Sequence, residues 1–254
     1  MNPSRLIHAG GHSFAIFQIY YDERSRNALD PCFEPYEHTE LDAGFESSVI
    51  ARLVSEGRHG SADYVGVFSW RFAAKIPIGT PRLLAQLADD AGAADAYAFF
   101  GRVVDRRIWL TAERKHPGIL NAAALLLDRL GVWIAPAAID APVVYQHHVI
   151  CRAHLYERFV RELLAPALSA MARKDDHELQ RRLSVDAGYQ DPRFPGTRLR
   201  SLFGRPHFTL HPFVAERLFS TWLALHPEIR LRQIWHGRFV EAAAVPHEPE
   251  MRRT

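Results

Sequence analysis

Apolar runs alternate with segments of helical spacing along the first half of the chain. Residues 14–21 (FAIFQIYY) are apolar on both faces apart from Gln18, which is typical of a strand in the middle of a sheet. Residues 41–56 repeat apolar side chains at helical spacing and predict a helix that ends at Gly57.

The same alternation continues further along. Residues 64–70 predict a second strand, and Thr80 and Pro81 then begin a helix as its N-cap and first residue. A short strand over 96–100 follows, and after a polar connection residues 116–133 predict a helix with Pro117 in its first turn and Gly131 just past its end. This βαβα order predicts an α/β fold with a mainly parallel or mixed sheet and helices on both faces.

The second half is less regular. Residues 141–152 predict a strand, and residues 155–174 an amphipathic helix with a bend at Pro166. Residues 174–212 are rich in charge, Gly and Pro and predict a long loop or small irregular subdomain, a kind of segment that is often functional. A helix over 211–227 follows.

Composition narrows the class of protein. The chain has 254 residues, 48% hydrophobic and 24% charged, with no repeat or linker, so we expect a single domain over 1–254. A net charge of +2 does not indicate nucleic-acid binding. With only Cys32 and Cys151, and with neither a signal peptide nor a membrane-spanning run, we expect a cytoplasmic protein.

Polar side chains follow the first two predicted strands. Asp22 comes after the first strand, and Trp70, Arg71 and Lys75 come at and after the end of the second. Ligands of open α/β sheets bind beyond the carboxyl ends of the strands, where cations neutralise phosphates and an indole stacks on a ring. The alternative is that Trp70 belongs to the core and that Arg71 and Lys75 are solvated.

Two carboxylates lie on predicted helices beside apolar faces. Glu216 and Arg217 are the only charges of a helix that is apolar nearly all round, and Glu46 stands beside Phe45. A buried carboxylate needs a partner, because its desolvation is costly. Two alternatives follow for each carboxylate. It is either a structural group, in an ion pair or a helix cap, or a functional group that holds a substrate hydroxyl or acts as a base.

The histidines and the remaining acids give weaker indications of metal binding. His147 and His148 stand in the predicted strand 141–152, and His116 precedes a helix, but no zinc signature is present. Asp95 is a weak candidate ligand for magnesium or manganese, because it stands at the start of its strand rather than at the end.

Several familiar motifs are absent. No GxGxxG follows the first strand, and the sequence contains neither GxxxxGK[ST] nor GxSxG. Dinucleotide oxidoreductases, P-loop enzymes and α/β-hydrolases are disfavoured accordingly.

Seven segments together resemble a group of bacterial glycosyltransferase-like proteins from surface-polysaccharide loci. They are IFQIYYDERSRNALDPCFEPY, the helix with Glu46, ADYVGVFSWRFAAK, DAYAFF, WLTAERKHPGIL, YQHHVICRAHLYERFV and FVAERLFSTWLAL. The resemblance implies a GT-A-like transferase with a Rossmann-type sheet. It places Tyr21 and Asp22 near the base or ribose of a nucleotide sugar, makes Trp70, Arg71 and Lys75 the basic cluster at a strand end, and matches Glu216 and Arg217 to the ERL motif of the group.

The chain departs from that group in two places. His147 and His148 stand where Asn and an aromatic residue are usual, and no Asp-x-Asp follows residues 96–100. The resemblance implies a Mn²⁺ or Mg²⁺ ion, and the second departure leaves open whether Arg71, Lys75 or a histidine does its work. It also leaves open a loss of catalysis.

These observations lead to two hypotheses. The first is a glycosyltransferase that moves a sugar from a nucleotide diphosphate to a carbohydrate or lipid-linked acceptor in envelope polysaccharide synthesis, with Glu216 and then Glu46 as candidate catalytic carboxylate. Such an enzyme works in the cytoplasm or at the inner face of the inner membrane, beside other enzymes of polysaccharide assembly. The second is a non-catalytic nucleotide-sugar-binding or scaffold protein of the same fold.

Overall fold

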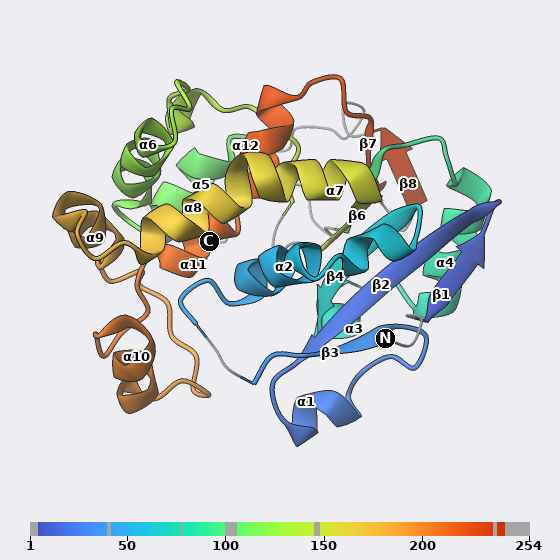
Figure 1. Ribbon diagram of the computed structural model, residues 1–254, viewed down its shortest axis with the longest axis horizontal. Helices are drawn as coiled ribbons and strands as arrows, with labels where there is room; N and C mark the ends of the chain where they lie inside the picture. Colours follow the sequence, from blue (N-terminus) through green and yellow to red (C-terminus); the bar gives the residue numbers. More distant parts are fainter. Residues whose placement is uncertain are drawn as a thin grey trace, which may run out of the picture.

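One mixed β-sheet organises the chain (Figure 1). The computed structural model describes residues 5–39, 42–76, 78–99, 106–144, 148–235 and 238–241. Within these ranges the sheet has eight strands: seven follow the order β1-β2-β4-β6-β5-β7-β8, and the eighth, β3, pairs with the second half of β2. The strands are β1 (Leu6–Ala9), β2 (His12–Tyr20), β3 (Glu34–Glu37), β4 (Tyr64–Ser69), β5 (Ala96–Ala98), β6 (Val149–Arg152), β7 (Leu231–Trp235) and β8 (Arg238–Glu241). Strands β2, β3, β4, β5 and β7 share one direction, and β1, β6 and β8 oppose it.

The centre of the sheet is the pair β2 and β4, which run parallel. Both strands are buried over most of their length, as their apolar runs predict. Gln18, the one polar residue inside β2, donates from Nε2 to the Ser69 carbonyl oxygen at 3.3 Å and accepts from the Asp30 backbone N at 2.7 Å. These bonds satisfy the buried amide and tie β2 to β4.

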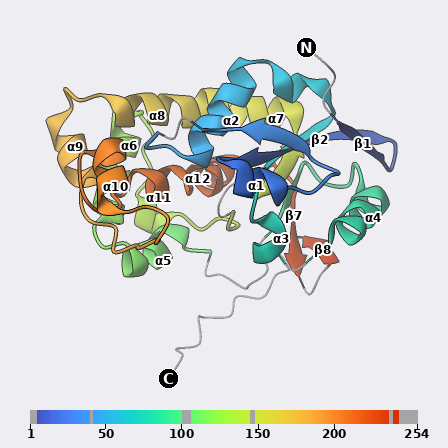
Figure 2. The same cartoon turned by 90° about the horizontal axis from the view of Figure 1, so that it is seen from below.

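Helices cover both faces of the sheet (Figure 2). Side chains of β2 alternate between two cores: Phe17 and Ile19 pack under α2 and α7, and Phe14 and Ile16 pack toward α3 and α4. The α-helices are α1 (Glu23–Asn27), α2 (Glu46–Ser55), α3 (Phe72–Lys75), α4 (Thr80–Asp90), α5 (Ile108–Lys115), α6 (Ile119–Arg129), α7 (Ala153–Phe159), α8 (Ala165–Ala172), α9 (His177–Leu183), α10 (Gly196–Phe203), α11 (His211–Ala215) and α12 (Leu218–Leu225). The expected α/β class, with a mixed sheet and helices on both faces, is confirmed.

Gly66 in β4 lies against the neighbouring strand β6. A Cβ at this position would approach Ile150 Cγ1 to 2.8 Å and the Val149 carbonyl oxygen to 3.1 Å. We expect Gly66→Ala to lower the free energy of unfolding by about 1–3 kcal/mol through overpacking, measured by urea denaturation. Gly60→Ala is the matched control, because a Cβ there meets no atom within 4 Å. Equal unfolding midpoints for the two variants would contradict the tight approach of β4 and β6.

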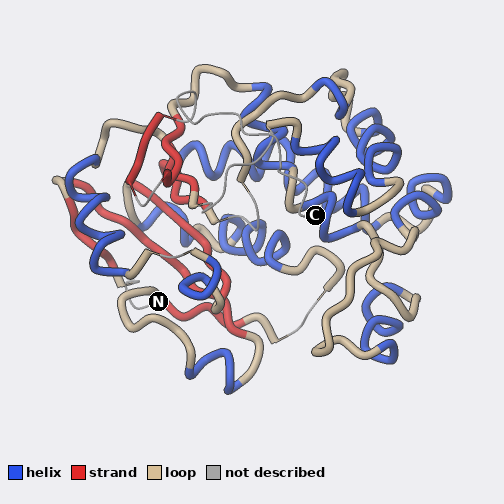
Figure 3. The backbone as a smooth tube through the Cα atoms, turned by 180° about the vertical axis from the view of Figure 1, so that it is seen from behind, coloured by secondary structure: helices blue, strands red, loops and turns tan. Residues whose placement is uncertain are grey.

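Most helices from the second half of the chain gather beside the sheet (Figure 3). The predicted helix 155–174 consists of α7, a π-helical segment η3 (Val160–Leu164) and α8. Pro166 has no N–H to continue the α-helical hydrogen-bond pattern, and the Ala165 N–H already bonds five residues back, to the Val160 carbonyl. The interruption expected at Pro166 is therefore a π segment just before it.

Several predicted boundaries were wrong. Helix α5 occupies the segment after β5 that was expected to be a polar connection, and Pro117 precedes α6, whose N-cap is Gly118. Gly79, not Thr80, is the N-cap of α4, and the Thr80 hydroxyl donates to Asp30 instead. A polar-looking segment such as α5 becomes helical because it buries Ile108 and Trp109 in the core.

The predicted helix over 211–227 is broken at Glu216 and Arg217, between α11 and α12. The Arg217 backbone N–H bonds the Val214 carbonyl, three residues back, instead of the Phe213 carbonyl. The Arg217 guanidinium donates to the Phe213 carbonyl in its place. This exchange turns the chain where its two charges lie, so Glu216 stands at a helix end rather than inside a helix.

The described helices bear on membrane association. None of the helices in the described part of the chain combines the length and the apolar character that crossing a bilayer requires.

Candidate functional site

A cavity of about 850 Å³ lies beyond the carboxyl ends of β2 and β4. Because the two strands are parallel, with Ile19 opposite Ser69, the residues that follow them leave the sheet at the same edge. Tyr21 and Asp22 follow β2, and Trp70 and Arg71 follow β4. The sequence-based expectation that these side chains share one edge is confirmed.

Residues from distant segments complete this cavity. Of the predicted site residues it brings together Tyr21, Asp22, Glu46, Trp70, Arg71, Lys75 and Glu216. The other charged and aromatic residues that line it are Arg24, Phe45, Tyr189, Asp191, Arg193, Phe194, Arg198, Phe208 and Phe213. Cations, carboxylates and aromatic rings therefore face one space whose volume falls within the roughly 300–1,000 Å³ of small-molecule sites.

Glu46 and Tyr21 form a hydrogen-bonded pair on the cavity wall. Glu46 is the first residue of α2, and its Oε1 accepts from the Tyr21 hydroxyl at 2.9 Å. Burial, and then the neighbouring Glu46 carboxylate, raises the pKa of Tyr21 well above its ordinary value, so the phenol keeps its proton. Glu46 thus has the partner that its position requires, and its second oxygen has no hydrogen bond within the described residues.

Lys75 shares the cavity with the two candidate carboxylates, Glu46 and Glu216, and both act on its charge. It ends α3 and is accessible to the solvent of the cavity, yet protein atoms surround it closely. This burial lowers the pKa of Lys75, the carboxylates of Glu46 and Glu216 oppose that effect, and the charges of Arg71 and Arg193 add to it. Within the described ranges neither Arg71 nor Lys75 forms an ion pair with a carboxylate. Their positive charge is available to an anionic ligand.

Glu216 and Arg217 differ in their exposure. The Glu216 side chain is 20% exposed and lines the cavity, whereas the Arg217 side chain is 3% exposed. Arg217 Nη1 lies 3.4 Å from Glu216 Oε2. Arg217 is outside the cavity lining and holds the turn between α11 and α12, so the binding role predicted for it gives way to a positioning role.

Asp22 has a structural role that the sequence did not reveal. It is the N-cap of α1, and its Oδ1 accepts from the Ser25 backbone N at 2.7 Å and from the Ser25 hydroxyl at 2.6 Å. These bonds lower the pKa of Asp22. The carboxylate therefore lines the cavity in its ionised form while it fixes the turn after β2.

Trp70 and Arg193 form a second wall of the cavity. Trp70 is half-buried, and the Arg71 and Arg193 guanidinium groups lie 5.8 and 5.9 Å from its ring. Arg193 also donates from Nε and Nη2 to Asp191, and this bond lowers the pKa of Asp191. The expectation that Trp70 faces the cavity is supported over its alternative as a core residue.

Phe45 begins the aromatic side of the cavity. Its φ of 47° is the only positive value among the described non-glycine residues, and its ring lies 5.6 Å from that of Phe194 and 6.3 Å from that of Phe208. A left-handed backbone at a bulky residue is strained and persists where packing enforces it. Contacts with residues from the 174–212 segment therefore fix the start of α2 and with it Glu46.

The predicted histidines lie behind the cavity or outside the described part. His148 precedes β6, which runs antiparallel to β4, so the histidine still reaches the edge where β4 ends; its Nε2 lies 3.5 Å from the Ser69 hydroxyl. His116 is buried, bonds the Ala187 carbonyl through Nδ1 at 2.7 Å and contacts the Phe213 ring, whose centroid lies 4.0 Å away. Neither lines the cavity, which corrects their assignment as binding residues. His147 lies outside the described residues.

Asp95 is not available as a metal ligand, which corrects that candidate. Its carboxylate accepts from Arg152 at 3.2 Å and from Arg230 at 3.0 Å. Burial alone would raise the pKa of Asp95, but the hydrogen bonds from Arg230 and Arg152 outweigh it and lower the pKa. It stands at the start of β5, away from the cavity edge. In the described part of the chain no three His, Cys, Asp or Glu residues gather as a metal site.

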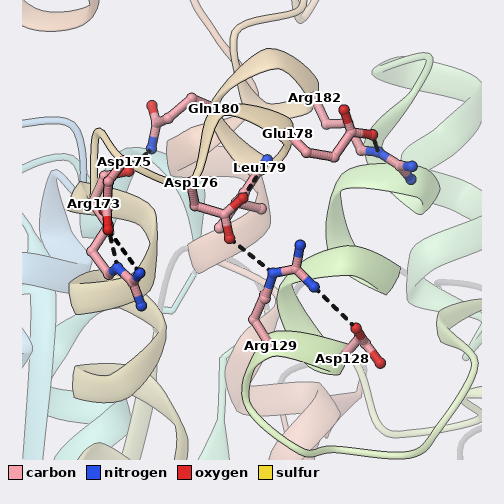
Figure 4. Close-up of polar contacts among 9 residues, drawn as sticks. All are labelled: Asp128, Arg129, Arg173, Asp175, Asp176, Glu178, Leu179, Gln180 and Arg182. Atoms are coloured by element: carbon pink, nitrogen blue, oxygen red, sulfur yellow. Dashed lines mark hydrogen bonds and ion pairs between the residues drawn. The ribbon is translucent and has the colours of Figure 1, made fainter.

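The segment 174–212 supplies functional candidates that the sequence did not single out. Tyr189, Asp191, Arg193 and Arg198 come from it, although only its length and composition pointed to function. Within it, α9 is bonded to its neighbours. Arg129 Nε on α6 donates to Asp176 at 2.8 Å (Figure 4). Gln180 Nε2 on α9 donates to the Met171 carbonyl on α8 at 2.7 Å. These hydrogen bonds hold α9 in place, and α9 precedes the residues between 189 and 198 that line the cavity.

Comparisons with known proteins do not assign the chain to a family. No protein-family model, no curated protein and no solved structure matches it.

Proposed function

We propose that the protein is a glycosyltransferase that uses a nucleotide-diphosphate sugar. The observation that carries the proposal is the convergence of Arg71 and Lys75 with Trp70 and two carboxylates in one cavity at the carboxyl edge of β2 and β4. Each part matches one part of such a donor: cations for the diphosphate, rings for the base or sugar, and carboxylates for hydroxyl groups.

The diphosphate is the leaving group, and its negative charge has to be stabilised as it departs. Arg71 and Lys75 lie on consecutive turns after β4 and have no carboxylate partner within the described residues. Positioned cations in a partly enclosed site stabilise developing charge more strongly than water does. They are our candidates for this role.

Two carboxylates are candidates for the general base that takes the proton from the acceptor hydroxyl. Glu216 lies at a helix end beside Arg217, and Glu46 accepts a hydrogen bond from the Tyr21 hydroxyl. Glu216 is our first candidate for the general base, because its carboxylate lines the cavity at the end of α11 and its side chain is 20% exposed. In the transfer step the bond from the anomeric carbon to the diphosphate oxygen breaks and the diphosphate leaves with its electron pair. The acceptor oxygen bonds the anomeric carbon, and the hydroxyl proton passes to Glu216.

The divalent ion that the resemblance implies does not fit the described residues well. The carboxylates on the cavity wall have other partners: Asp191 bonds Arg193, Asp22 bonds Ser25 and Glu46 bonds Tyr21. Hard cations such as Mg²⁺ and Mn²⁺ prefer several converging oxygen ligands. We therefore assign the stabilisation of the diphosphate to Arg71 and Lys75 and no step to a metal ion.

The acceptor and the place of the reaction follow from the same proposal. A carbohydrate or lipid-linked acceptor in envelope polysaccharide synthesis puts the enzyme in the cytoplasm, at most bound peripherally to the inner membrane. The half-exposed carboxylates and rings of the cavity suit a hydroxyl-rich acceptor.

Thermal shift with nucleoside diphosphates tests the proposal. We expect UDP or GDP to raise the melting temperature without manganese, because binding to the folded state alone stabilises it. We then expect the protein to consume the sugar derivative of the nucleotide that raises the melting temperature, and to release the nucleoside diphosphate. If no nucleotide moves the melting temperature, the enzyme proposal fails. Nucleotide-sugar binding without turnover in the presence of carbohydrate acceptors would favour the non-catalytic binding protein.

A further inference from the structure

The five cations of the cavity fall into two groups. Arg71, Lys75 and Arg193 lie close enough for the charges of the two arginines to act on Lys75. Arg24 and Arg198 form the other group: both line the cavity, and the charges of both act on Asp22. Arg24 is on α1 and Arg198 on α10, two helices that lie at the same edge of the molecule in Figure 1.

The second group is held by local contacts. Asp22 caps α1 through Ser25, which fixes the helix that carries Arg24. The Arg198 guanidinium lies 4.8 Å from the ring of Phe194, and that ring packs against Phe45, the N-cap of α2. Both arginines are exposed and line the same cavity.

This group is not neutralised by the protein. Across the described ranges neither Arg24 nor Arg198 forms an ion pair with a carboxylate, whereas Arg193 is bonded to Asp191. The Oδ1 atom of Asp22, the carboxylate on which both arginines act, accepts two hydrogen bonds from Ser25. The hydrogen bonds from Ser25, and after them the charges of Arg24 and Arg198, lower the pKa of Asp22 and keep this carboxylate ionised. Two guanidinium groups and one carboxylate leave a net positive charge on this side of the cavity.

We propose that Arg24 and Arg198 form a second anion subsite, which binds a phosphate group of the acceptor. The inference rests on the proposed function, in which Arg71 and Lys75 stabilise the single diphosphate of the donor. Guanidinium groups bind phosphate oxygens in pairs, and two arginines from separate segments surround one phosphate. The subsite selects an acceptor that carries phosphate over a neutral sugar. A soluble sugar phosphate and a lipid phosphate share this chemistry.

Phosphate binding by the double variant Arg24→Gln/Arg198→Gln tests the subsite. With the donor site filled by UDP, calorimetry follows the binding of glucose 1-phosphate, and co-sedimentation follows the binding of phosphatidylcholine vesicles that contain phosphatidic acid. We expect the double variant to bind the effective probe at least about tenfold more weakly, while its affinity for UDP stays within about twofold of the wild type. The probe that binds identifies the source of the phosphate.

Matched controls lie two residues further along the same helices. Arg26→Gln on α1 and Arg200→Gln on α10 remove equal charge outside the cavity lining and should leave phosphate binding unchanged. Three results would each overturn the subsite. The first is an equal loss of phosphate binding in these controls, the second is an equal loss of UDP affinity in the double variant, and the third is unchanged phosphate binding in the double variant. If UDP does not bind, the proposed function fails, and the subsite is then tested by phosphate in an Arg71→Gln/Lys75→Gln background.

Discussion

Glu216→Gln should lower the rate of sugar transfer by about two to four orders of magnitude, the usual contribution of a positioned general base. The amide cannot take the hydroxyl proton. Folding should remain intact, because the side chain is 20% exposed and the amide oxygen can still accept from Arg217 at the 3.4 Å contact. The measurement is the release of nucleoside diphosphate from the nucleotide sugar that raises the melting temperature most, together with the thermal unfolding of the variant.

Two further variants separate the possible roles of the carboxylates. Glu46→Gln tests the second candidate, whose Oε1 accepts from Tyr21 at 2.9 Å. Glu157→Gln is the control, because that carboxylate is on α7, pairs with Arg161 and is outside the cavity lining. Full turnover by Glu216→Gln would remove Glu216 from the mechanism. An unfolded Glu216→Gln protein would show instead that the pair with the buried Arg217 is structural.

Loss of the two unpaired cations after β4 should weaken nucleotide binding strongly. We expect Arg71→Gln and Lys75→Gln each to reduce the affinity for UDP or GDP by about tenfold to a hundredfold, since hydrogen bonds to charged groups contribute roughly 1.5–3 kcal/mol. The combined variant should lose more than either alone, and the salt dependence of binding should become shallower. Calorimetry at low and high salt measures both effects.

Arg82→Gln provides the comparison, because Arg82 is an exposed cation of α4 outside the cavity lining. Lys75→Arg keeps the charge and should retain most of the affinity. Nucleotide binding that persists in the combined variant would move the phosphate site elsewhere, and Arg24 and Arg198 would be the next place to test.

The strongest predictions from the sequence came from long apolar runs. β2 and β4 are recognisable because both faces of each strand are buried, and the residues after them were expected at one edge as a consequence. Glu46 and Glu216 were found because a carboxylate beside apolar residues needs an explanation. The cavity contains all of these residues.

Short elements and long-range contacts were not predictable in the same way. β5 has three residues and β6 has four, so neither shows a period, and the reversed direction of β6 depends on its pairing with β4 and β5. The break at Glu216 depends on the Arg217 side chain reaching the Phe213 carbonyl. A helix pattern carries no information about such a contact.

The amino-acid sequence by itself determined an α/β sheet, the two central strands and the chemical character of the residues that follow them, because these depend on side-chain burial over a few neighbouring positions. Only the tertiary structure decided that Tyr189, Asp191, Arg193 and Arg198 enter the same cavity, that Asp95 is held by two arginines, and that His116 lies behind the wall. Those outcomes depend on the packing of segments far apart in the chain, and the free energy of such packing is not encoded in any local pattern.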